Sequence, residues 1–400
     1  MHHRRRHIAT ILKKRSRMFP VLGVLGARQV GKSTFLMKQW RQEMHAVYLT
    51  FDKREIVLRA KRSPEQFLLS ESQQEKKHLI IDEAHKVPHI FDSIKALIDE
   101  NRKMGAYTLS GSIEFSSKSG VRESLAGRIG ITRLYPMTLR ELNNEEFAAP
   151  WTKFNFKSYP SLLSPSSVET WLERGGMPIF CCFNDKEERI ASINSWLEAI
   201  CYRDLKQLEG AEYDPELAVN LLRTIAHKSD SPISLLSLSE LGATRASIKK
   251  HLLALEALFL IYELPSLENP AGLSMYKIFD AGVINALLGG NETIYSRHAC
   301  LLSLVTNEIY AQHEYAGKLK PKLFYYRTRG GAEIDLVIKT DHKIIGVNCT
   351  TNIDISPYNL RGMKSFLSNY PTAKGYIVAP VQTPYSIEKN ITVVPWNHIG

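Results

Sequence analysis

One short segment constrains this chain more than any other: a glycine-rich turn between an apolar strand and an amphipathic helix. The strand reads Val21–Leu25, and the helical pattern covers Thr34–Trp40. The turn matches the spacing G-x-x-x-x-G-K-[ST], which is typical of loops that wrap a polyphosphate. The residues that we expect to bind the phosphates of a nucleotide are Gly26, Ala27, Arg28, Gln29, Val30, Gly31, Lys32, Ser33 and Thr34.

Each part of this motif has a physical task. Gly26 and Gly31 let the backbone turn tightly, so that its N–H groups face the phosphates. The helix that follows presents its positive N-terminal end to the same anion. Lys32 would neutralise phosphate oxygens, and the Ser33 hydroxyl would bind Mg²⁺. The motif therefore predicts ATP and Mg²⁺ as ligands, and the simpler alternative is a glycine turn with a surface lysine.

A second apolar strand, His78–Ile81, ends in two carboxylates at a typical distance beyond the glycine-rich loop. Asp82 at the strand tip would hold the hydration shell of Mg²⁺, and Glu83 would polarise the attacking water. The pair has the form of a Walker B motif. The alternative is that Asp82 only caps a helix that begins near Ala84.

The net charge of +11 is concentrated at one end of the chain. Residues 1–42 contain eleven basic residues and no acidic one, whereas the rest contains 41 of each. Such a segment predicts contact with a polyanion, either nucleic acid or nucleotide. The alternative is a solvated basic arm that precedes the first strand.

Composition excludes several classes of protein. The apolar fraction of 44% is ordinary for a globular chain. No apolar run approaches the ~20 residues needed to cross a bilayer, and no apolar region follows the basic residues of Met1–Arg6 as in a secretory signal. The five cysteines lack C-x-x-C spacing, which argues against a zinc site and for a reducing compartment. We therefore expect a cytoplasmic protein without a membrane segment.

Four hundred residues exceed one compact core, so we expect an α/β protein in three parts. Residues 1–150 predict a P-loop parallel sheet with helices on both faces. Residues 151–265 are mostly helical, and residues 266–400 return to strands. The segment Asn143–Pro165 reads as a linker or irregular connection. The later strands are expected at Phe259–Leu264, Leu323–Arg327, Glu333–Ile338, Ile344–Val347 and Gly375–Ala379.

The loop sequence G-A-R-Q-V-G-K-S-T resembles that of a group of bacterial and archaeal AAA-type ATPases. These proteins carry a C-terminal domain of unknown function. The resemblance covers most of the chain and implies attack of water on the γ-phosphate of ATP. Its further landmarks are Ile80–Pro88, Leu109–Ser112, Ser124–Arg128, Leu134–Thr138 and Gly175–Pro178.

The resemblance assigns three more residues. Ser112 takes the position of a polar sensor of the γ-phosphate, although a turn serine is an equal alternative. Arg128 takes the position of an arginine that offsets transition-state charge, within the chain or across the interface of a homo-oligomer. Arg122 is the alternative for that role, and each arginine is otherwise a surface charge.

The middle part contains a helix-turn-helix pattern. Ile233–Leu241 reads as one helix, Gly242–Ala243 as the turn and Thr244 as the N-cap of a second helix. The strands that follow would form a wing, and the resemblance also implies a winged-helix-like segment. DNA contact is the functional interpretation, but we favour a packing module because the basic residues do not cluster. Those residues are Arg245, Lys249, Lys250 and His251.

The last part resembles a restriction-endonuclease-like fold, which places one acid on a helix and a second in a hairpin. Here these positions hold Glu308 and Asp335. The next strand should supply Glu-x-Lys but carries Asn348 and Thr350 instead. An amide is a poor Mg²⁺ ligand and threonine has no charge, so we expect this part to be inactive as a nuclease.

Together these features predict an ATP-hydrolysing AAA-type ATPase whose nucleotide state changes the conformation of its C-terminal parts. The alternative is a nucleotide-gated switch that binds DNA or a protein and hydrolyses little ATP. The expected catalytic residues are Lys32, Glu83, Ser112 and Arg128, and the expected metal ligands are Ser33 and Asp82.

Overall fold

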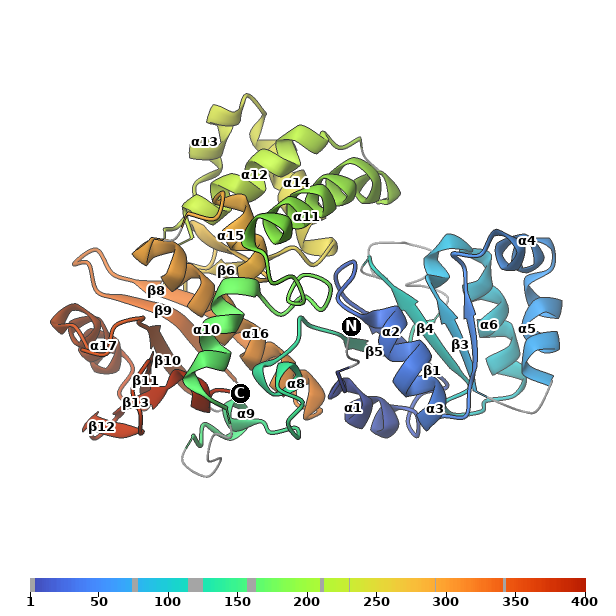
Figure 1. The fold of residues 1–400 in the computed structure, drawn as a ribbon, viewed down its shortest axis with the longest axis horizontal. Helices are drawn as coiled ribbons and strands as arrows, with labels where there is room; N and C mark the ends of the chain where they lie inside the picture. Colours follow the sequence, from blue (N-terminus) through green and yellow to red (C-terminus); the bar gives the residue numbers. More distant parts are fainter. Residues whose placement is uncertain are drawn as a thin grey trace.

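The computed structural model describes most of the 400-residue chain and shows helices and strands in three regions (Figure 1). Arg122 and Ser124 lie outside the described residues. Within those residues, no helix is both long enough and apolar enough to cross a bilayer. The described ranges are 4–73, 78–113, 125–156, 163–208, 212–229, 231–291, 293–340 and 343–400.

The N-terminal region is built on a five-stranded parallel sheet with the order β2-β3-β4-β1-β5. The central strands β1, β3 and β4 are buried along their whole length, as expected for a parallel sheet covered by helices. The predicted α/β fold is confirmed. The strands are β1 (Val21–Leu25), β2 (Val47–Thr50), β3 (Leu79–Asp82), β4 (Tyr107–Gly111) and β5 (Ile129–Arg133).

Helices pack around this sheet (Figure 1). The helix after the glycine-rich loop begins as α-helix, widens into one π-helical stretch and returns to α-helix. Such π-helical insertions are frequent near functional sites. The helices of this region are α1 (Ile8–Arg15), α2 (Lys32–Phe35), η1 (Leu36–Trp40), α3 (Arg41–Glu43), α4 (Arg54–Arg62), α5 (Pro64–Gln73), η2 (Ala84–Lys86) and α6 (His89–Glu100).

The middle region is mostly helical, as the sequence predicts. The segment expected to be a linker is packed rather than loose in its described part. Trp151 is fully buried, stacks edge-on against Phe156 and donates its backbone N–H to Gln312. The helices are α8 (Leu139–Leu142), α9 (Pro150–Lys153), α10 (Pro165–Arg174), α11 (Lys186–Ala199), η4 (Ile200–Asp204), η5 (Leu205–Gln207), α12 (Pro215–His227), α13 (Leu235–Leu238), η6 (Ser239–Leu241) and α14 (Arg245–Ala257).

The first helix of the helix-turn-helix pattern is shorter than the sequence predicts: α13 covers only Leu235–Leu238, a 3-10 turn covers Ser239–Leu241, and Ile233 forms a β-bridge with Ser274. Gly242 adopts a left-handed conformation with φ of 78°, and the Thr244 hydroxyl caps α14 by accepting the N–H of Ser247. The antiparallel pair β6 (Ile261–Pro265) and β7 (Ser274–Ile278) follows. His251, however, does not face outward: it is buried, and its ring accepts the backbone N–H of Asp214. A DNA-binding role for this segment stays a prediction.

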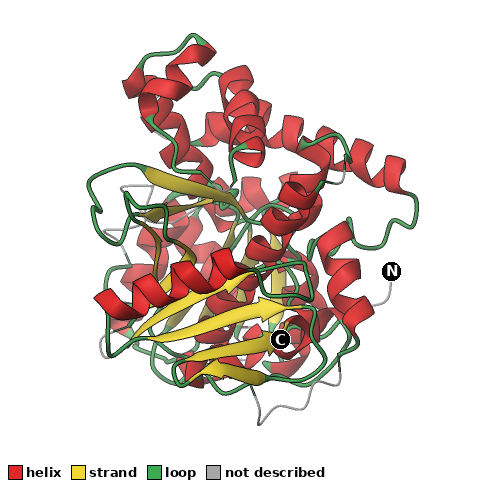
Figure 2. Ribbon diagram, turned by 90° about the vertical axis from the view of Figure 1, so that its left-hand side faces the viewer, coloured by secondary structure: helices red, strands yellow, loops and turns green. Residues whose placement is uncertain are grey.

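The C-terminal region is a six-stranded mixed sheet with the order β12-β13-β11-β10-β9-β8. Helix α17 lies across its strands (Figure 2). The last two strands were not expected from the sequence. The elements are α15 (Ala281–Leu287), α16 (Ile294–Tyr315), β8 (Lys322–Arg327), β9 (Glu333–Lys339), β10 (Ile344–Cys349), α17 (Pro357–Asn369), β11 (Lys374–Ala379), β12 (Tyr385–Glu388), β13 (Ile391–Pro395) and η7 (Trp396–His398).

Helix α16 joins the regions. It packs against α1 and β5 of the N-terminal region and also against β10 of the C-terminal sheet. Its side chains are buried from Ala299 to Tyr315 with the exception of Glu314. One hydrophobic core therefore runs from Ile8 to Ile399. The division of the chain at residues 150 and 265 stays a prediction.

Glu308 lies on α16 but does not have the role that the resemblance implies. Its carboxylate is fully buried and accepts the backbone N–H of Leu139 at 2.7 Å and the side-chain amide of Gln312 at 2.8 Å. It therefore caps the first turn of α8 and does not line the cavity that contains Asp335. Burial raises the pKa of Glu308 to about 7, although the hydrogen bond from Leu139 acts in the opposite direction.

We predict that Glu308→Gln weakens the pH dependence of stability. The pKa of Glu308 is higher in the native state than in the unfolded chain, so native stability falls as the pH rises from about 4.5 to about 7. Replacement by glutamine removes this fall. The difference in unfolding free energy between pH 5 and pH 8 should shrink by roughly 2 to 3 kcal/mol.

Urea unfolding at the two pH values measures this difference. The exposed Glu65→Gln on α5 serves as the control and should leave the pH dependence unchanged. An identical pH dependence in wild type and Glu308→Gln would contradict the assignment.

Candidate functional site

The glycine-rich loop leaves β1 and enters α2 through two positions that require glycine. Gly26 and Gly31 have φ values of 157° and 102°. A Cβ atom at Gly26 would lie 2.3 Å from the carbonyl oxygen of Leu134, so that position has no room for a side chain. Gln29 adopts φ of 62° without being glycine. The loop is thus held in a tight turn that faces the N-terminal end of α2.

Lys32 is buried in this loop. Its ammonium donates to the carbonyl oxygens of Gly26 at 2.8 Å and of Ala27 at 2.9 Å. Burial lowers the pKa of Lys32, whereas the nearby carboxylates of Glu83 and Asp82 raise it. The cation therefore lies within electrostatic reach of both predicted acidic residues.

Asp82 ends β3 at the same edge of the sheet. Its buried carboxylate accepts the hydroxyl of Tyr48 at 2.7 Å and that of Ser110. The Ser110 hydroxyl also accepts the backbone N–H of Glu83 at 3.1 Å. Sequence reasoning missed Ser110, although a polar residue near the carboxyl end of a neighbouring strand is the signal that would reveal it.

Glu83 follows directly and adopts a left-handed backbone conformation, with φ of 57°. A non-glycine residue in that region stores strain, which is common at functional sites. Its carboxylate lies 3.3 Å from the ring Nδ1 of His85. Burial raises the pKa of Glu83, and the Lys32 ammonium opposes that rise. These surroundings suit a group that accepts a proton from water.

The other two predicted catalytic residues lie at opposite ends of the sheet's strands. Ser112 follows the carboxyl end of β4 and is buried on the side of the glycine-rich loop. Arg128 precedes β5, whose first residue pairs with Val21 at the start of β1. Arg128 therefore lies at the end of the sheet where the parallel strands begin. Its guanidinium donates two hydrogen bonds to the carboxylate of Asp99, at 2.8 and 2.9 Å. In this structure Arg128 is thus directed away from the glycine-rich loop, and its action in hydrolysis, within the chain or across an interface, stays a prediction.

The residues present fit Mg²⁺. Ser33 offers an exposed hydroxyl at the start of α2, and Asp82 offers a carboxylate whose orientation is fixed by hydrogen bonds. Among the described residues, no group of three His, Cys, Asp or Glu side chains could hold a metal ion. Ser33 and Asp82 would supply the one or two protein oxygens that Mg²⁺ usually takes, and water and phosphate would complete its shell.

Arg6, from the basic N-terminal segment, is not solvated. Its buried guanidinium donates to the carbonyl oxygens of Val30 at 2.8 Å and Tyr135 at 2.5 Å, and it forms an ion pair with Glu141 at 3.1 Å. Glu141 also accepts the backbone N–H of His7 at 2.7 Å. Arg6 thereby ties the glycine-rich loop to the segment that begins α8.

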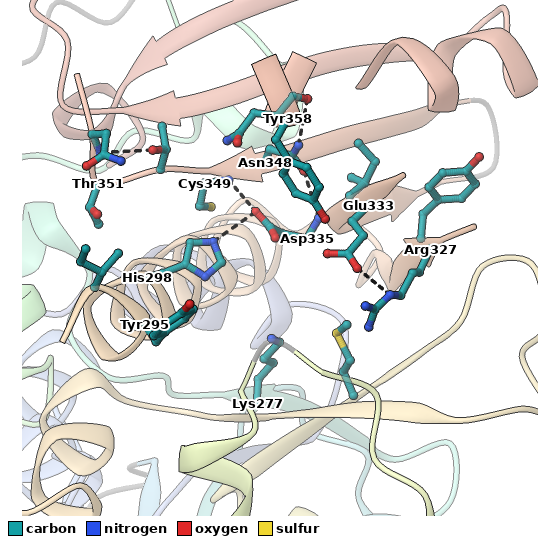
Figure 3. Close-up of a pocket in the computed structure, with 17 residues that line it drawn as sticks. Lys277, Tyr295, His298, Arg327, Glu333, Asp335, Asn348, Cys349, Thr351 and Tyr358 are labelled. Atoms are coloured by element: carbon teal, nitrogen blue, oxygen red, sulfur yellow. Dashed lines mark hydrogen bonds and ion pairs between the residues drawn. The ribbon is translucent and has the colours of Figure 1, made fainter. Parts of the chain in front are cut away.

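A polar cavity of about 400 Å³ lies between the C-terminal sheet and β7 (Figure 3). Asp335, Asn348 and Thr350 line it, as the resemblance implies. In place of Glu308, however, α16 contributes His298, whose Nε2 lies 3.4 Å from the Asp335 carboxylate. The backbone N–H of Cys349 donates to the same carboxylate at 2.7 Å.

The electrostatics of this cavity keep Asp335 ionised. Burial alone would raise the pKa of Asp335, but His298, the Cys349 N–H and the Lys277 ammonium together hold it below its usual value. Lys277 reaches toward the cavity from β7 (Figure 3). The restriction-endonuclease-like fold and the loss of nuclease activity stay predictions.

Family models match three segments of the chain. An AAA domain matches residues 18–143, a domain of unknown function (DUF8612) matches residues 166–293, and another (DUF4143) matches residues 300–399. Two uncharacterised proteins, of Mycobacterium tuberculosis and Mycobacterium bovis, are each 24% identical to this chain over 99% of its length and 84% of their own.

Solved structures show weaker likeness. A Walker-type ATPase of Pyrococcus abyssi covers 71% of this chain and 95% of its own length, with 16% identity and a TM-score of 0.42. A signal-transduction ATPase of Pyrococcus horikoshii covers 79% and 47%, with 11% identity and a TM-score of 0.24. These scores are too low to support an inference. The glycine-rich loop, the parallel sheet and the domain match support an AAA-type P-loop ATPase domain in residues 18–143, and residues 300–399 are similar to DUF4143.

We predict that Arg6→Ala destabilises the protein strongly. The substitution leaves the fully buried carboxylate of Glu141 without its ion-pair partner, which costs roughly 3 to 5 kcal/mol for a buried pair. Arg5→Ala removes an adjacent exposed arginine and is the matched control, with an expected change below about 0.5 kcal/mol. Thermal unfolding measures both variants, and equal melting temperatures for the two would refute a structural role for Arg6.

Proposed function

We propose that this chain hydrolyses ATP in the presence of Mg²⁺ and transmits its nucleotide state to the C-terminal regions. One observation carries the first half of the proposal. Lys32 follows the carboxyl end of β1, Asp82 and Glu83 stand at the carboxyl end of β3, and both strands pair in parallel with β4, so the three charges lie at the same end of the sheet. A phosphate-binding cation and two carboxylates with different surroundings are what water attack on a phosphoryl group requires.

Each residue has a defined task in this proposal. Lys32 offsets charge on the terminal phosphates while the loop N–H groups hold them. Glu83 orients the attacking water and accepts its proton. Ser33 and Asp82 would hold Mg²⁺, which supplies further positive charge at the phosphate oxygens. Ser112 lies at the same edge and is proposed to contact the terminal phosphate.

The second half of the proposal rests on two connections to the rest of the chain. Arg6 links Val30 in the loop to Glu141 in α8, and Glu308 on α16 accepts the N–H of Leu139 in the same short helix. A displacement of the loop would therefore act on α16 through buried polar contacts.

A cation–π cluster provides the other connection. The guanidinium of Arg133, at the carboxyl end of β5, lies 4.3 Å from the ring centre of Phe259 and 5.2 Å from that of Tyr262. These rings begin the β6–β7 hairpin, so the edge of the sheet that carries the glycine-rich loop contacts the middle region directly.

Steady-state ATP hydrolysis tests the proposal. We predict turnover by the wild type, loss of nucleotide binding in Lys32→Ala and a loss of about 100-fold or more in kcat in Glu83→Gln with binding retained. Lys38→Ala on the same helix is exposed and serves as the control. Each variant is assayed with and without DNA.

The outcomes separate the proposed function from its alternative. Nucleotide binding without turnover in the wild type, under every condition, would favour a nucleotide-gated switch for DNA or a protein. Turnover that survives Glu83→Gln would contradict the role of Glu83. Stimulation by DNA would identify the polyanion as the client.

A further inference from the structure

A cavity of about 540 Å³ lies beside the glycine-rich loop, between the loop and helix α11. The loop contributes Arg28 and Gln29, and the helical side contributes Phe180, Trp196 and Arg203. Phe180 and Trp196 are buried and pack edge to face. The two arginines thus stand on opposite sides of one opening next to the phosphate-binding loop.

A buried carboxylate lies between these two arginines. Asp204 is 3% exposed in its side chain and accepts the Arg28 guanidinium at 3.2 and 3.3 Å. The Nε of Arg203 donates to the same carboxylate at 3.2 Å. Asp204 is the last residue of η4, the π-helical stretch that continues α11. Its position therefore depends on an inserted turn of a kind that is frequent at functional sites.

This ion cluster belongs to the electrostatic surroundings of Lys32. The charge of Arg28 lowers the pKa of the Lys32 ammonium, and the charge of Asp204 raises it, alongside the stronger effects of burial and of Glu83. The pKa of Lys32 therefore depends on the charges of Arg28 and Asp204 as well as on the two carboxylates at the end of β3. An anion that enters the loop would meet Arg28 as well as Lys32.

Carboxylate and phosphate are competing partners for a guanidinium. Both present paired oxygens to the planar fork of arginine, but a nucleotide triphosphate brings more negative charge than one carboxylate. The cluster holds two cations and one anion, so it retains an unbalanced positive charge. If phosphate takes Arg28, Asp204 keeps only the partly exposed Arg203 as its partner, and the burial of Asp204 becomes less favourable.

We propose that Asp204 is an internal anion that holds Arg28 in the nucleotide-free protein and is exchanged for the terminal phosphate of ATP. The exchange releases η4 from the loop. Arg28 then distinguishes ATP from ADP, because ADP lacks the phosphate that replaces Asp204. This inference rests on the proposed nucleotide binding and adds a ligand-exchange site that no family match assigns.

Nucleotide titration of the full chain tests the exchange. The probes are ADP and a non-hydrolysable ATP analogue, each with Mg²⁺, in isothermal titration calorimetry. Asp204→Asn removes the competing anion and should tighten binding of the ATP analogue about tenfold, with ADP affinity changed less than about twofold. Arg28→Ala should weaken binding of the analogue about tenfold and leave ADP affinity nearly unchanged.

A second carboxylate on the helical side provides the control. Glu173 on α10 pairs with Arg189 at 2.6 Å but does not line the cavity beside the loop. Glu173→Gln should leave both affinities unchanged. If Asp204→Asn weakens the ATP analogue, or behaves like Glu173→Gln, Asp204 is not a competitor of phosphate and the proposal fails.

Hydrogen exchange in the wild type gives an independent readout that requires no variant. Backbone amides of residues 200–208 should exchange faster with the ATP analogue than with ADP or without nucleotide. Equal exchange in all three states would overturn the release of η4. If the wild type binds neither nucleotide, the proposed function and this inference fail together. If it binds both nucleotides without these differences, only the exchange fails.

Discussion

The arrangement of this protein depends on one buried ion pair, between Arg6 and Glu141. A charge removed from water needs partners, and those of Arg6 include the carboxylate of Glu141 and the carbonyl oxygens of Val30 and Tyr135. Because these groups belong to the glycine-rich loop, to the end of the central sheet and to α8, the pair fixes three segments relative to one another. Helix α16 completes the junction, since its Tyr315 hydroxyl accepts the backbone N–H of Tyr135 at 3.2 Å.

The parts of the site that the sequence predicts are those that depend on neighbours along the chain. A glycine-rich loop needs a strand before it and a helix after it, and all three are visible within twenty residues of sequence. Asp82 and Glu83 are predictable for the same reason, because an apolar run that ends in carboxylates indicates a strand tip in a parallel sheet. The left-handed turn at Gly242 and the N-cap at Thr244 are likewise predictable, because both depend only on residues nearby in the sequence.

The residues that escaped prediction owe their roles to distant partners. Nothing near Arg6 in the sequence indicates burial, and Ser110 matters only because β3 lies beside β4. Glu308 shows the reverse error: a resemblance gives its helix but not the direction of its side chain, which points to α8 rather than to Asp335. Arg128 is similar, because only the register of β5 against β1 reveals that it starts the strand at the far edge. Strands β12 and β13 were missed because their exposed, polar first member obscures the hairpin.

The hydrophobic core that α16 shares with the N-terminal region limits how the segments of this chain can be separated. The family matches divide the chain into separate segments, with one border near residue 143 and another near residue 300. Yet Tyr310 stacks on Tyr135 across that division, and Glu314 pairs with Arg15 at 2.6 Å. An N-terminal unit transplanted alone would expose the faces of α1 and β5 that α16 covers. In this chain the first and last segments therefore pack as one matched unit, whatever lies between them in the sequence.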